Sequence, residues 1–195
     1  MTNSIKGGFT PSRNRGGRPN SGGLEAYPIA NSYNITLGHG DPVKVSAGFL
    51  VQADNNKRVV GVFQGCYYID PTTKQPRNLN YFPANTSSGG LLLGYDSPIG
   101  FVSDQAGTYV AEVNSSISAG NVGDLYTVAF GTVSTVTGQS AAVIDTSAGA
   151  VAAVSASTAM VRILGLYNEP GNEWMASSGA GFTAVECEFI NQGLE

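Results

Sequence analysis

The chain has 195 residues, of which 42% are hydrophobic and only 12% are charged, and its formal net charge is −4 at pH 7. This length can build one hydrophobic core or two small ones, since domains usually span about 100 to 200 residues. The negative charge argues against a body that binds nucleic acid, because phosphate contacts need clustered Lys and Arg. A surface so poor in charge favours a protein that packs against neighbours.

The first 24 residues differ from the rest of the chain in charge. They hold four basic residues, no acidic residue, six glycines and two prolines, so from Glu25 onward six basic residues stand against 14 acidic ones. We predict an extended basic arm over residues 1–25 and a body over residues 26–195. Such an arm can become ordered on an acidic surface. A solvated disordered tail and a weak, salt-sensitive nucleic-acid tail are the two alternatives.

From Tyr33 onward, short runs of strand-forming residues alternate with turn residues, which is typical of all-β proteins. The first predicted strands are Tyr33–Leu37 and Val43–Val51, the second with a bulge at Gly48. A hairpin at Asp54–Lys57 then leads into a strand that runs from Arg58 to Ile69.

The middle of the body is less regular. Asp70 and Pro71 predict an exposed turn, and residues 77–103 predict a long irregular excursion within the body. Further strands are predicted at Gly107–Val113, Leu125–Phe130, Ala141–Asp145, Met160–Leu166 and Phe182–Ile190. In the first of these, Tyr109, Ala111 and Val113 share one face. About ten short strands result, enough for a single β-barrel or β-sandwich body with an extended N-terminal arm.

The last predicted strand separates acidic from apolar side chains. Val185, Cys187 and Phe189 share one face, while Glu186 and Glu188 share the other. Two acids at this spacing resemble a glycosidase pair. Alternating solvent-facing Glu is nevertheless the ordinary pattern of an amphipathic strand that resists edge pairing, and we favour that interpretation.

The sequence offers little chemistry for an enzyme, a metal site or a cofactor. His39 is the only histidine, and no Gly-x-Ser-x-Gly elbow accompanies it, so acyl-transfer catalysis is not supported. Cys66 and Cys187 lie far apart and lack zinc-ligand spacing. We therefore predict no catalytic, metal or cofactor site, and two buried reduced thiols.

The chain shows neither a secretory signal nor a membrane span. Its start lacks the apolar stretch of about 7 to 15 residues that a signal peptide contains. The longest weakly apolar region is shorter than the roughly 20 residues of a spanning helix. These features predict synthesis in the cytoplasm and no membrane partner.

Several motifs taken together resemble small structural proteins of tailed bacteriophages. They lie within Pro42–Pro83 and Val161–Asn191, and they are Val45-Ser-Ala-Gly-Phe49, Val60-Gly-Val-Phe-Gln-Gly65, Asp70-Pro-Thr-Thr-Lys-Gln-Pro76 with Tyr81-Phe-Pro83, Val161-Arg-Ile-Leu-Gly165 and Asn172-Glu-Trp174. None of these motifs is catalytic, and Gly89–Ser103 departs from the pattern.

This resemblance implies a capsid decoration, or cement, protein. Such a protein is made in the host cytoplasm, binds the exterior of the virion as a homotrimer and clamps adjacent subunits of the major capsid protein. With this interpretation, the arm would lie on the shell. The predicted capsid-binding residues of the arm are Ile5, Lys6, Phe9, Arg13, Arg15 and Arg18, and possible interface residues of the body are Tyr81, Phe82 and Trp174.

Two other interpretations remain open. The protein could be another virion component, such as a head fibre base or a tail-associated β protein. It could also be a carbohydrate-binding module, in which Tyr67, Tyr68, Tyr81 and Trp174 would form a platform on which sugar rings stack.

Overall fold

The computed structural model describes residues 8–14, 23–54, 58–103, 107–150, 159–169, 172 and 183–190. The described part of the chain is built from strands and one short 3-10 helix. The strands are β1 (Thr10–Asn14), β2 (Leu24–Pro28), β3 (Pro42–Ser46), β4 (Phe49–Gln52), β5 (Gly61–Ile69), β6 (Pro76–Leu79), β7 (Ile99–Ser103), β8 (Gly107–Glu112), β9 (Leu125–Ala129), β10 (Val143–Asp145), β11 (Val161–Leu166) and β12 (Ala184–Phe189), and the helix η1 is Ala119–Asn121. The predicted all-β class is confirmed.

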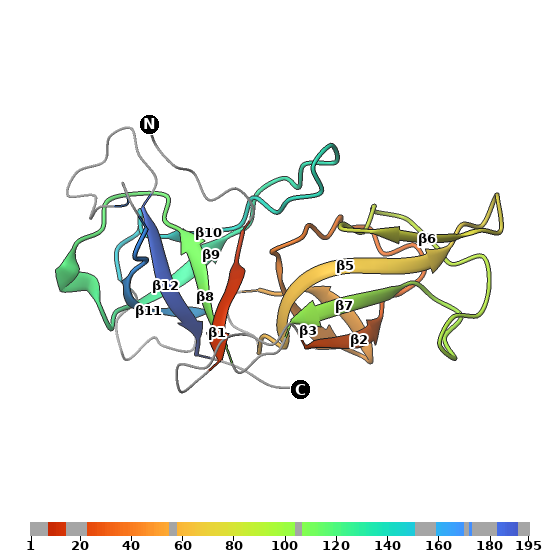
Figure 1. The fold of residues 1–195 in the computed structure, drawn as a ribbon, viewed down its shortest axis with the longest axis horizontal. Helices are drawn as coiled ribbons and strands as arrows, with labels where there is room; N and C mark the ends of the chain where they lie inside the picture. Colours follow the sequence, from red (N-terminus) through yellow and green to blue (C-terminus); the bar gives the residue numbers. More distant parts are fainter. Residues whose placement is uncertain are drawn as a thin grey trace.

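The strands form two six-stranded antiparallel sheets that make two lobes side by side (Figure 1). The first lobe has the strand order β1-β8-β12-β11-β9-β10. The second has the order β2-β7-β5-β3-β4, with β6 paired to β5. In chain order, β1 therefore belongs to the first lobe, β2–β7 form the second lobe, and β8–β12 complete the first.

The first sheet curls toward closure. Just beyond β8, Val113 forms a parallel bridge with Ile144 of β10, and the backbone N–H of Asn114 donates to the carbonyl of Ile144 at 3.1 Å. Closing a sheet on itself removes exposed edges. The first lobe thus approaches a small barrel, to which β1 is added beside β8.

Each lobe has its own hydrophobic cluster. In the first, the rings of Tyr109 and Phe189 lie 4.9 Å apart, and those of Phe9 and Phe189 lie 5.3 Å apart. Ala53, Val59 and Val62 come from the segments around the start of β5 and pack into this same cluster. The second cluster gathers Ile29, Leu37, Val43, Leu50, Val60, Phe63, Cys66, Tyr68, Phe82 and Val102. The lobes are therefore joined by buried apolar contacts as well as by the chain.

The alternation predicted from the sequence holds in the first lobe. Tyr109, Ala111 and Val113 are buried, as are Val185, Cys187 and Phe189. On the opposite face of β12, Glu186 pairs with Arg13 of β1, and Glu188 pairs with Arg162 of β11 at 3.0 Å. These ion pairs between partly exposed side chains on different strands support the sheet register, although each contributes only about 0.2–1 kcal/mol.

Several predicted elements differ in the structure. Residues 43–51 form a hairpin and not one bulged strand, because Ala47 and Gly48, with φ values of 51° and 82°, make a tight turn between β3 and β4. Tyr33 and Leu37 form only isolated bridges, to Thr86 and Phe82. Within the predicted excursion, residues 76–79 and 99–103 are strands, so the irregular part is shorter.

The N-terminal segment also differs from the expectation. Residues 10–14 of the predicted arm form β1, which pairs with β8. Gly8 and Phe9 lead into this strand, and the N–H of Phe9 donates to the carbonyl of Gly40 at 2.9 Å. We call Gly8–Asn14 the strap, because it runs along the first lobe and is fastened to a loop of the second.

Removing the Phe9 ring should destabilise the fold strongly. Phe9 is fully buried, so Phe9→Ala leaves a cavity and should lower the free energy of unfolding by about 3–5 kcal/mol. The exposed neighbour Thr10 provides a matched control, and Thr10→Ala should change it by no more than about 0.5 kcal/mol. Urea unfolding followed by circular dichroism measures both, and equal effects of the two substitutions would contradict the buried anchor.

Candidate docking surfaces

A buried carboxylate joins the two lobes. Asp41 is 1% exposed, and its Oδ2 accepts a hydrogen bond from the N–H of Gly38 at 2.7 Å, while its Oδ1 accepts one from the Ser140 hydroxyl at 2.5 Å. Gly38 and Asp41 belong to the loop before β3 of the second lobe, whereas Ser140 precedes β10 of the first. Burial raises the pKa of Asp41, and hydrogen bonds from Ser140, Gly38 and Gln52 partly oppose this rise.

Backbone hydrogen bonds surround this carboxylate. The N–H of His39 donates to the carbonyl of Gly138 at 2.8 Å, and the N–H of Ser140 donates to the carbonyl of His39 at 2.9 Å. Within the second lobe, the N–H of Gly40 donates to the carbonyl of Phe63 in β5 at 2.8 Å. We call Gly38–Asp41 with Gly138–Ser140 the junction, because it fixes the position of one lobe against the other.

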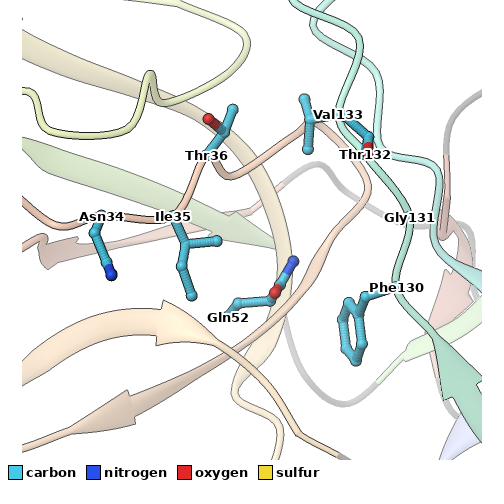
Figure 2. A pocket seen from close by; sticks show the side chains of 8 residues that line it. All are labelled: Asn34, Ile35, Thr36, Gln52, Phe130, Gly131, Thr132 and Val133. Carbon is cyan, nitrogen blue, oxygen red and sulfur yellow. The ribbon is translucent and has the colours of Figure 1, made fainter.

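A cleft of about 450 Å³ opens beside the junction, between the lobes. Figure 2 shows its two walls, with Ile35 and Gln52 on the side of the second lobe and Phe130 on the side of the first. The lining residues are Asn34, Ile35, Thr36, Gln52, Phe130, Gly131, Thr132 and Val133. We call this the interlobe cleft. Its lining combines apolar side chains with amides and hydroxyls and includes no acid or base.

An apolar hairpin tip projects from the second lobe. Leu91, Leu93 and Tyr95 are 69%, 67% and 45% exposed. Leu92 and Tyr95 exchange two backbone hydrogen bonds of 2.8 Å, which closes a two-residue turn at Leu93 and Gly94. Both turn residues have positive φ, 49° and 86°, as this tight turn requires. A leucine in the left-handed region is uncommon. We call Leu91–Tyr95 the distal tip.

The base of the distal tip is tightly held. The N–H of Gly89 donates to the carbonyl of Ile69 at 2.6 Å, and the N–H of Ser88 donates to the side-chain oxygen of Asn31 at 2.9 Å. A Cβ atom on Gly89 would lie 2.6 Å from the Cα of Pro71, so only glycine fits this close approach. These contacts fasten the start of the loop that carries the tip to Ile69, Pro71 and Asn31.

A second loop with an exposed apolar residue lies near the junction. Val136 is 94% exposed in the turn Ser134–Gly138, which we call the waist loop. The amide of Asn80 donates to the carbonyl of Thr137 at 2.7 Å, so this loop of the first lobe is held against the second.

The structure gives several predicted site residues a role in the fold. Phe9, predicted to anchor the arm on a capsid, is fully buried against Phe189, so in this fold its ring packs in the first lobe. Arg13 pairs with Glu186. Phe82, predicted at an interface, is fully buried and exchanges backbone hydrogen bonds with Leu37.

The other predicted residues are placed less decisively. Tyr81 is half-buried, and its carbonyl accepts a weak hydrogen bond from the Cys66 thiol at 3.2 Å. Tyr68 is buried in the second cluster and is therefore unavailable to a sugar-stacking platform. Tyr67 is partly buried in β5. The residues Ile5, Lys6, Arg15, Arg18 and Trp174 lie outside the described residues.

Both cysteines are free and buried, as predicted. They belong to different clusters, Cys66 in the second lobe and Cys187 in the first. Burial raises the pKa of Cys66 to about 12 and raises that of Cys187 as well. Both thiols are therefore protonated at neutral pH and weakly nucleophilic.

Sequence reasoning missed the distal tip and the interlobe cleft. The tip carried a signal, since three consecutive leucines followed by glycine are unusual at a loop. The cleft carried none, because its lining residues come from three separate stretches of the chain. Among the described residues, no group of acidic, Cys or His side chains could hold a metal ion, and no helix is long and apolar enough to cross a membrane.

The fold and these surfaces were compared with known proteins. No family model matches the chain, and neither the curated proteins nor the solved structures give a significant match.

The raised pKa of Asp41 predicts how stability depends on pH. The pKa of Asp41 in the folded protein exceeds its unfolded value of about 4. Asp41 therefore contributes most to the free energy of unfolding below the unfolded pKa, and this contribution falls as pH rises through the folded pKa. The free energy of unfolding of the wild type minus that of Asp41→Asn should therefore decrease between about pH 4 and pH 7. Urea titrations at a series of pH values measure this difference.

Asp145 provides a control of opposite sign. Hydrogen bonds from Ser147 and Asn114 lower its pKa. Its contribution is therefore lost as pH falls through the folded value. The free energy of unfolding of the wild type minus that of Asp145→Asn should therefore increase with pH. A difference for Asp41→Asn that also increases would contradict the dominance of burial at the junction.

Proposed function

We propose that this protein is a non-enzymatic structural component of a tailed-phage virion that decorates the capsid exterior and clamps adjacent subunits of the major capsid protein. The observation that carries the proposal is the apolar surface exposed at the distal tip, where Leu91, Leu93 and Tyr95 lie close together on one loop. Exposed apolar side chains that are grouped in this way are typical of protein docking sites. The sequence resemblance to phage structural proteins supports the same function.

The composition of the whole chain fits a protein packed among others. Only 12% of its residues are charged, so docking removes few ion–water contacts, and desolvation of charge is the costly part of burying a surface. The body is also elongated, with two lobes side by side (Figure 1). An elongated, rigid body can span a boundary between two shell subunits.

The cationic residues near the strap supply the second contact with the shell. Arg13 lies in β1, and Lys6, Arg15 and Arg18 lie close to the strap in the sequence. The fold holds the strap to the body through β8 and Gly40. An acidic surface on the capsid would attract these cations, at a strength that falls with added salt.

Neutralising the arm cations should weaken capsid binding without disturbing the fold. The variant Lys6→Gln, Arg15→Gln, Arg18→Gln keeps Phe9 and β1 intact, so it tests the cations alone. Three exposed ion pairs at about 0.3–1 kcal/mol each predict roughly a tenfold loss of affinity. Binding to phage heads assembled without this protein, measured by co-sedimentation at two salt concentrations, reads out the change.

A matched variant removes the same number of charges from the exposed body. In Arg58→Gln, Lys74→Gln, Arg77→Gln the net charge changes equally, and occupancy of the heads should stay close to that of the wild type. Undiminished occupancy by the arm variant would exclude a role for the arm. Cryo-electron microscopy of decorated heads separates a capsid position from a head fibre base or a tail position.

A further inference from the structure

The distal tip and the interlobe cleft complement one another in chemistry. No residue from Ser87 to Tyr95 carries a charge at neutral pH, and the cleft lining likewise includes no acid or base. The tip presents Leu91, Leu93 and Tyr95. The cleft offers the exposed side chain of Ile35 and the partly buried ring of Phe130, beside the amides and hydroxyls of its lining. Protein interfaces commonly combine apolar contacts with polar groups and are depleted of charge at their centre.

The two surfaces also complement one another in shape. Leu93 and Gly94 form a tight two-residue turn that is closed by the isolated bridge between Leu92 and Tyr95, so the tip is narrow at its end. The cleft of about 450 Å³ is open to solvent between two walls. Ile35 is 40% exposed on one wall, so apolar surface is available for the turn to cover.

One molecule cannot bring these surfaces together by itself. The distal tip shortly precedes β7, whose first residue lies at the end of the second lobe away from the first lobe (Figure 1). The cleft lies between the lobes, beside the junction. Since the junction holds the lobes in place, the tip of one copy can reach only the cleft of another.

We propose that the distal tip of one copy docks into the interlobe cleft of a second copy of this chain. This inference deepens the proposed function and rests on it, since a decoration protein lies beside its own copies on the shell. The contact is head-to-tail, with different surfaces on the two partners, so it either closes into a ring or continues as a filament.

Among possible occupants, a second copy is favoured by the absence of charge on both surfaces. A strongly acidic or basic partner would find no counter-charge in the cleft. The distal tip, in turn, has the apolar groups and the narrow edge that the cleft accepts. Both surfaces are also present in equal number in every preparation of the protein.

Two single substitutions test the contact, each on one surface. Leu93→Asp places a carboxylate on the distal tip, and Ile35→Asp places one in the cleft. Each should weaken self-association by about tenfold or more, because a charge buried without a partner opposes docking. Val122→Asp adds the same charge at an exposed position beside η1, outside both surfaces, and should leave self-association unchanged. Light scattering after size exclusion, over a range of concentrations, gives the mass.

Mixing the two variants distinguishes head-to-tail contact from other modes. Leu93→Asp keeps an intact cleft and Ile35→Asp keeps an intact tip, so the mixture should form a two-chain species that cannot grow further. Each variant alone should remain monomeric. Two variants that stay monomeric when mixed would overturn the proposal, as would single variants that assemble like the wild type.

Cross-linking detects the contact even when it is weak. A Leu93→Cys variant mixed with a Thr132→Cys variant under mild oxidation should give a covalent dimer, while Leu93→Cys mixed with Val122→Cys should not, because Val122 is exposed outside both surfaces. Equal yields from both mixtures would overturn the proposal. The two native thiols are buried, so they contribute little to the background.

Capsid binding separates this inference from the proposed function. Heads that are decorated by a wild type showing neither assembly nor specific cross-linking would overturn the tip–cleft contact and leave the proposed function standing. A tip–cleft contact in a protein that never binds heads would overturn the proposed function and leave the contact between copies standing. Loss of head binding by Leu93→Asp, with a wild type that neither assembles nor cross-links, would assign the tip to a shell subunit and overturn the contact between copies.

Discussion

The relative placement of the two lobes depends on the Asp41 carboxylate. Its two oxygens receive hydrogen bonds from Gly38 within the second lobe and from Ser140 of the first, and a buried carboxylate is tolerated only when such donors replace water. Close backbone approaches reinforce it. A Cβ atom on Gly8 would lie 2.5 Å from the carbonyl oxygen of Gly40, and one on Gly38 would lie 2.8 Å from the N of Ser140. The strap, the loop before β3 and the segment before β10 therefore approach one another so closely that a side chain would not fit at Gly8 or Gly38.

This junction lies close in the chain to both walls of the interlobe cleft. Residues 34–36 shortly precede Gly38–Asp41, and residues 130–133 lie within ten residues of Ser140, so both walls adjoin segments that the junction hydrogen bonds hold together. Anchoring near a binding surface reduces the conformational entropy that is lost when a partner docks. The loop of the distal tip is anchored separately, since its base is held by Ile69 and Asn31.

Sequence patterns predicted the strands whose burial alternates and missed those whose position depends on distant partners. β8 and β12 alternate apolar and polar side chains, so period-two patterning located them. β1 has the sequence Thr-Pro-Ser-Arg-Asn, which has little strand propensity, and it forms because β8 supplies hydrogen bonds and Phe9 an apolar anchor. The two candidate docking surfaces also differ in how far the sequence reveals them. The leucine triplet of the distal tip was visible in the sequence, whereas the cleft exists only once residues far apart are brought together.

The strap changes how the basic N-terminal segment can act. A free tail loses much conformational entropy when it is ordered on a partner. Here the chain is fastened at Asn14 by β1 and again at Leu24 by β2, so Arg15 and Arg18 belong to a connection with both ends tethered to the body. On the proposed shell, this tethering would shorten the distance over which the cations must be ordered and would raise their effective concentration at the docked surface. The buried Phe9 ring adds to the hold on β1, which fixes one end of the connection.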